Sequence, residues 1–240
     1  MTATDRLVEF THTGAPSPEA LEHAGTQLAT FRGAAEQGAE QPVVRALRAV
    51  LGAPAEARQR APWQAWLAAC AAADAPVEWV AVCATGSALA PEGESVAATA
   101  VGYQVAAATS AALGPAHSAA GWCVRATAGT IGAAAAAGRL LGLDPAALRA
   151  MFGICATQAA GISSASGTDA AAVAIGKAAA NAVEAALLAR QGFTSSAQPL
   201  EGRRGMFALM SPEPDESAFL AGLSASPVAG PVADLRAGRP

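Results

Sequence analysis

Alanine-rich segments, closed by glycine or proline, constrain the fold of this chain more than any other feature. Alanine is the best helix former, and its small side chain lets helix axes approach closely. Hydrophobic residues make up 52% of the 240 residues but aromatic residues only 5%, so a core must consist mostly of Ala, Leu and Val. β-Branched runs with strict alternation are absent from the sequence. The pattern predicts an all-α fold, a compact bundle of about eight to ten helices.

Capping residues and helix breakers divide the chain. Ser17 precedes Pro18, and Asp144 precedes Pro145, which is the order expected of an N-cap and a first helical position. Gly114-Pro115 stops a long run of helix formers. The predicted helices span residues 4–10, 18–37, 42–51, 62–73, 95–113, 126–141, 145–160, 171–191 and 216–223. We expect a helical domain at 1–210 and a C-terminal tail at 211–240 that is partly disordered, because it is richer in Pro, Ser and Gly.

Charge and cysteine usage exclude several classes of protein. The formal net charge is -4 and the arginines are scattered, which argues against a nucleic-acid partner. The four cysteines show no CxxC spacing and no nearby histidine cluster, so we expect reduced thiols in a cytoplasmic protein and no metal site. The uncharged stretches 96–116 and 150–168 consist mainly of Ala and Gly with polar residues, which argues against a membrane span. Nothing in the sequence indicates an organic cofactor.

Four blocks in the second half of the chain carry a family resemblance. They read GAAAAAGRLLGLD, ATQAAGISSASGT, GKAAANAVEAALLARQGF and LEGRRGMF. In this order and at these separations they resemble the helical domain of the MmgE/PrpD family, which includes 2-methylcitrate dehydratases and cis-aconitate decarboxylases. RLVEF, PEALEHA, GAAEQG and VGYQVAAATSAALG extend the resemblance to about 210 residues.

The sequence departs from the family pattern at the residues that carry the chemistry. Where the family has a catalytic stretch written roughly HALDFDDTH, this chain reads CATGSALAPEGESVAATAVGYQV, with Glu92 and Glu94 as the only carboxylates. A family histidine aligns with Cys123, and the family's catalytic lysine and its histidine align with Ala171 and Ala174. The family continues into an α/β lid domain, whereas this sequence ends about 30 residues after LEGRRGMF.

Lys177 and Asp169 are the predicted catalytic residues. Lys177 is the only lysine, matches the second lysine of the family pattern, and shares a helical face with Asn181 and Glu184. It would bind an anionic group as a point charge, or alternatively belong to a polar stripe that packs against a loop or subunit. Asp169 precedes the last long helix, where it would act as a general base or simply cap the helix.

The remaining candidates are predicted to bind substrate. Arg125 is a candidate anion contact, and Cys123 inherits a family active-site position. His117 follows a helix-ending Gly-Pro, and a lone loop histidine is more often at the surface than catalytic; it is kept as a further candidate. Hydroxyls near the last long helix could donate to substrate oxygens or satisfy backbone groups: Ser163, Ser164, Ser166 and Thr168.

Two functional hypotheses follow. The first is a repurposed lyase-type subunit that carries out an elimination, decarboxylation or ring-forming step on an anionic small molecule in a bacterial biosynthetic pathway. Its site would be shared with a partner, either in a homodimer or in a heterodimer with a related helical subunit. The alternative is a non-catalytic pseudoenzyme, a stabilising subunit of a heteromeric complex, which the loss of the acid-base residues favours.

Overall fold

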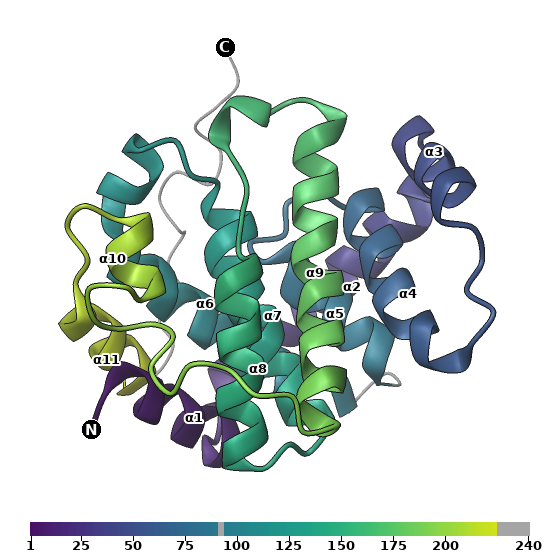
Figure 1. Cartoon of the computed structure of the whole chain (residues 1–240). Helices are drawn as coiled ribbons and strands as arrows, with labels where there is room; N and C mark the ends of the chain where they lie inside the picture. The colour runs from purple at the N-terminus through teal and green to yellow at the C-terminus, as the bar shows by residue number, and fades with distance from the viewer. Residues whose placement is uncertain (91–93, 225–240) are drawn as a thin grey trace.

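A computed structural model describes residues 1–90 and 94–224, without the side chains of residues 57, 58 and 94. In this part of the chain there are eleven α-helices, one short 3-10 helix and no β-strand, so the predicted all-α fold is confirmed (Figure 1). The helices are α1 (Ala3–Thr13), α2 (Pro18–Gly38), α3 (Pro42–Leu51), α4 (Ala57–Ala71), α5 (Val80–Leu89), α6 (Glu94–Ala119), α7 (Val124–Leu140), α8 (Pro145–Gln158), η1 (Ser163–Ala165), α9 (Asp169–Arg190), α10 (Met206–Met210) and α11 (Glu216–Ser224).

Both predicted N-caps are confirmed. The Ser17 hydroxyl accepts a hydrogen bond from the Ala20 N–H at the start of α2, and the Asp144 carboxylate accepts one from the Ala147 N–H at the start of α8. Each side chain satisfies one of the backbone donors that a helix leaves unpaired in its first turn.

The core lies around α7, which packs against α5, α6, α8 and α9. In Figure 1, α8 and α9 run side by side in front of it. Residues 126–138 of α7 are all buried. At the crossing of α6 and α7, a Cβ atom added to Gly132 would lie 2.5 Å from the carbonyl oxygen of Gly102. The small residues therefore bring two helix backbones into direct contact.

Several helices differ from the sequence-based prediction. The pattern does not predict α5, because its residues 80–86 are all buried and a helix that is apolar on every side has no amphipathic period. α4 begins at Ala57, so Pro62 lies inside the helix instead of opening it. α6 is interrupted at Gly114, whose φ of 64° lies in the left-handed region, and a short helical segment follows Pro115.

Two helices of the described part have the length and composition of membrane spans. They are the segment Ser95–Ala119 of α6 and the whole of α9. Most of each apolar window is buried inside the protein, 72% and 61% respectively, as in the core helices of a helical bundle.

The C-terminal end of the described chain packs on α6. The helix predicted at 216–223 is present as α11, and its Phe219 and Leu223 are buried. The Gln104 side chain of α6 donates to the carbonyl oxygen of Gly222, at 3.1 Å. The disorder predicted for the tail falls largely on residues 225–240, which lie outside the described residues.

Candidate functional site

Two distant segments pair at one end of the bundle. The Cys123 N–H donates to the carbonyl oxygen of Gly161 at 3.0 Å, and the Ser163 N–H donates to that of Gly121 at 2.8 Å. Trp122 and Ile162 thereby form an antiparallel bridge. We call residues 121–125 and 161–169 the α7/α9 rim; in Figure 1 the chain that joins α8 to α9 lies at the upper end of this helix pair.

The rim gathers most of the predicted substrate-binding residues. Cys123 is half-buried and is the N-cap of α7. The Thr168 hydroxyl donates to the carbonyl oxygen of Ala165, at 2.6 Å, and is occupied within the rim. The side chains of Ser163, Ser164 and Ser166 are exposed, and no other described residue forms a hydrogen bond with their hydroxyl groups. These three hydroxyls are available to a ligand or to a partner chain.

Asp169 is the first residue of α9 and is exposed. The prediction that it caps the helix is wrong, because the N-cap is Thr168, whose side chain makes no capping hydrogen bond. Within the described chain nothing bonds to the Asp169 carboxylate. The carboxylate therefore stands at the N-terminal end of α9 and is open to a ligand or a partner chain.

Arg125 joins the rim to the end of α4. Its Nη2 donates to the carbonyl oxygen of Ala73 at 2.8 Å, while its Nε is buried with no partner among the described residues. Burial lowers the pKa of this guanidinium, against the opposing effect of Cys123 and Asp74. The predicted anion contact is therefore partly committed to holding α4, with one buried donor left unpaired.

Lys177 lies away from the rim. It follows Asp169 by eight residues, which corresponds to about 12 Å along the helix axis. Its Nζ lies 4.6 Å from the centroid of the Trp66 ring on α4, in a groove that Glu184 also lines. The structure thus confirms that Lys177 and Glu184 share a face, but it does not bring the two predicted catalytic residues together.

His117 is fully buried, which corrects the expectation that a loop histidine lies at the surface. Its Nδ1 lies 2.8 Å from the carbonyl oxygen of Met210, and its Nε2 lies 2.8 Å from the Thr127 hydroxyl. A carbonyl can only accept, so Nδ1 carries the proton. Burial lowers the pKa of this histidine. Since both ring nitrogens have protein partners, neither is free to bind a substrate, and His117 holds helices together.

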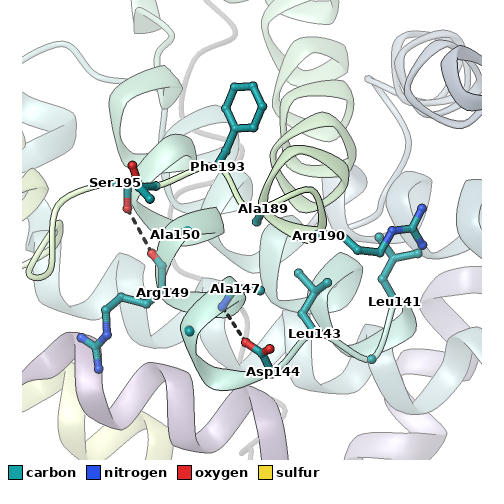
Figure 2. Close-up of a pocket in the computed structure, with 14 residues that line it drawn as sticks. Leu141, Leu143, Asp144, Ala147, Arg149, Ala150, Ala189, Arg190, Phe193 and Ser195 are labelled. Atoms are coloured by element: carbon teal, nitrogen blue, oxygen red, sulfur yellow. Dashed lines mark hydrogen bonds between the residues drawn. The ribbon is translucent and has the colours of Figure 1, made fainter.

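A cleft that sequence reasoning missed lies at the opposite end of α8 and α9 (Figure 2). It has a volume of about 570 Å³ and lies between the start of α8 and the end of α9, with Phe193 at its edge. Arg149 bonds to Asp5 and to the Ala197 carbonyl, so its charge is already engaged. None of the predicted site residues lines this cleft.

Metal ligands do not gather in the described part of the chain. There, no three side chains of His, Cys, Asp or Glu are placed to hold one ion. Glu92 and the side chain of Glu94, which stand in the altered catalytic stretch, lie outside the described residues.

The fold and the rim define an all-α bundle with one exposed, hydroxyl-rich end. Residues 65–218 match the family described as the MmgE/PrpD N-terminal domain, and the chain belongs to this family. The match excludes the first 64 residues, where RLVEF, PEALEHA and GAAEQG stand as a resemblance only. No curated protein shows a significant match to the chain.

Proposed function

We propose that this chain is a helical subunit that contributes the α7/α9 rim to a lyase-type site completed by a second polypeptide. The observation that carries the proposal is the backbone pairing between residues 121–123 and 161–163. Ser163, Ser164, Ser166 and Asp169, which stand at this pairing or within the residues that follow it, are all exposed. A site for carbanion chemistry needs water to be excluded, and a rim this open does not exclude it. A covering partner is therefore required.

The chemistry would be an elimination, decarboxylation or ring-forming step on an anionic small molecule. Serine hydroxyls donate hydrogen bonds to carboxylate oxygens, and an exposed aspartate can accept a proton next to a leaving group. The partner would supply the general acid and most of the positive charge. Ile162, which is 60% exposed at the centre of the rim, provides an apolar contact for that partner.

The test compares the chain alone with the chain co-expressed with the products of its neighbouring genes. Cis-aconitate and 2-methylcitrate serve as trial substrates because they are the substrates of the family. We expect a complex whose mass exceeds that of this chain, turnover only in the complex, and a loss of about 10²-fold in kcat for Asp169→Asn. Arg204→Met, which changes an exposed charge outside the rim, should retain wild-type turnover.

One observation favours the second candidate, a non-catalytic stabilising subunit. In the described chain, Asp169 is the only acidic side chain of the rim and has no acid partner there. If the complex forms and turns over equally well with Asp169→Asn, the subunit stabilises its partner and the catalytic proposal fails. A lone chain that is a stable monomer and catalyses the reaction would refute both.

A further inference from the structure

A second concave site lies between the end of α3, residues 59–66 of α4 and residues 177–190 of α9. We call it the α4/α9 groove; its volume is about 740 Å³, within the range of small-molecule sites. Its walls include Trp63 and Trp66 on α4, and Lys177, Glu184 and Arg190 on α9. We propose that this groove binds a small amphipathic monoanion, a carboxylate on an apolar body.

The aromatic wall is held against α9 by close packing. A Cβ atom added to Gly176 would lie 2.5 Å from the Cδ1 atom of Trp66 and 2.5 Å from the Cys70 sulfur. The Trp66 ring therefore has no room to move toward α9 at this point. The face of this ring offers an apolar surface for the body of a ligand.

The charge of the groove favours an anion. Lys177 and Arg190 are cationic and only Glu184 is anionic among its lining residues. Lys177 has no ion-pair partner in the described chain, and its ammonium lies over the Trp66 ring, 4.6 Å from the centroid. A cation held over an aromatic face is partly desolvated, so a carboxylate that reached it would form a stronger contact than it would in bulk water.

The same wall contains unsatisfied hydrogen-bond donors. The indole Nε1 atoms of Trp63 and Trp66 are both buried, and neither has a hydrogen-bond partner in the described chain. The Cys70 sulfur lies near the Trp66 N–H but is a weak acceptor. Burial raises the pKa of the Cys70 thiol to about 12, and the Trp66 N–H partly opposes that rise. An unpaired buried donor destabilises the folded protein, and an acceptor from a bound ligand would offset that cost.

The ligand class follows from these contacts. The carboxylate would bond to Lys177 and approach an indole N–H, while the apolar body would cover the Trp63 and Trp66 rings. Because both indole nitrogens are closed to water, an acceptor reaches one only when its ring turns, so binding must change the tryptophan fluorescence. This inference rests on the groove alone and is independent of the α7/α9 rim.

The experiment titrates the full chain with 4-phenylbutyrate and, separately, with its neutral amide, by calorimetry and tryptophan fluorescence. We expect the carboxylate to bind more tightly than the amide. Lys177→Met, which keeps an unbranched side chain of similar length and removes its charge, should weaken carboxylate binding about tenfold and leave amide binding unchanged. Arg204→Met also removes one cation, but this exposed residue does not line the groove, so the variant should bind both ligands as the wild type does.

A second variant separates loss of the site from loss of the fold. Trp66→Phe keeps an aromatic ring and removes one indole donor, so it should weaken carboxylate binding and reduce the fluorescence change. Circular dichroism and the melting temperature establish that each variant is folded. Equal affinity of Lys177→Met and wild type for the carboxylate overturns the proposal, as does the absence of binding to the wild type. Asp169→Asn should leave groove binding intact, so failure at the rim and failure at the groove are distinguishable.

Discussion

His117 connects three parts of the bundle through a single ring. Its nitrogens reach the carbonyl oxygen of Met210 and the hydroxyl of Thr127, and its face stacks on Trp122 with the ring planes 5° apart. Trp122 belongs to the rim, so a buried histidine supports the surface on which the proposed site stands. The sequence supplies the histidine, but the burial that lowers its pKa comes from the packing of the helices around it, and the Met210 carbonyl opposes that shift from 93 residues away.

The stability of the protein should depend on pH through His117. Its pKa in the folded state lies below the ordinary value of 6.5, so the unfolded chain binds more protons below that pH. The free energy of unfolding should therefore fall as pH drops from about 7 toward about 5. Above about pH 7 the stabilisation that comes from the neutral His117 is fully present. Urea unfolding at several pH values measures this slope.

A variant comparison isolates the contribution of His117. His117→Gln, although less stable overall, should show a shallower dependence of the free energy of unfolding on pH in that window. His12→Gln, which changes an exposed histidine, should keep the wild-type slope. Identical slopes for wild type and His117→Gln would refute the assignment.

At the scale of the helices, close backbone contact determines how the elements pack. α6 and α7 cross at Gly102 and Gly132, and α4 meets α9 at Gly176. The first contact centres the core on α7, and the second places the Trp66 ring beside Lys177. Glycine in the interior of a helix destabilises that helix. At these positions the close packing that glycine permits between helices offsets the loss.

Two glycine-to-alanine changes should have opposite effects. In Gly132→Ala the new methyl group would lie 2.6 Å from the Ala106 Cβ, so the helices must separate and the protein should lose about 1–3 kcal/mol. In Gly33→Ala, inside α2, a Cβ meets nothing within 4 Å, and the protein should gain about 0.4–1 kcal/mol. Denaturant unfolding measures both; a loss in Gly33→Ala, or no loss in Gly132→Ala, would contradict the packing argument.

At the scale of the whole molecule, the two ends of the described chain are joined through a buried carboxylate. Glu201, in the LEGRRGMF block, accepts hydrogen bonds from the backbone N–H and the hydroxyl of Thr4 at 3.1 and 2.5 Å. α1 is thus fixed to a segment 197 residues away. The family block therefore has a structural role that its sequence does not reveal.

Removal of this carboxylate should loosen α1. Glu201→Ala leaves two buried donors of Thr4 unpaired, and we expect a loss of about 2–3 kcal/mol in the free energy of unfolding. Glu9→Ala removes a carboxylate of α1 that forms an exposed ion pair with Arg6, and should cost less than about 1 kcal/mol. Amide hydrogen exchange should show faster exchange in α1 for Glu201→Ala only. Equal losses in the two variants would show that the buried contact does not stabilise the fold.

The sequence alone determined the helical class, most helix boundaries and the family. Helix propensity, N-caps such as Ser17 and Asp144, and breakers such as Gly114 act within a few residues, so they can be read along the chain. The tertiary structure decided what the polar residues do. Cys123 meets Gly161, His117 is buried, and Lys177 lies in a groove about two helical turns from Asp169. These outcomes depend on which helices pack together, and in a core of small side chains that choice is made by contacts between segments far apart in the sequence.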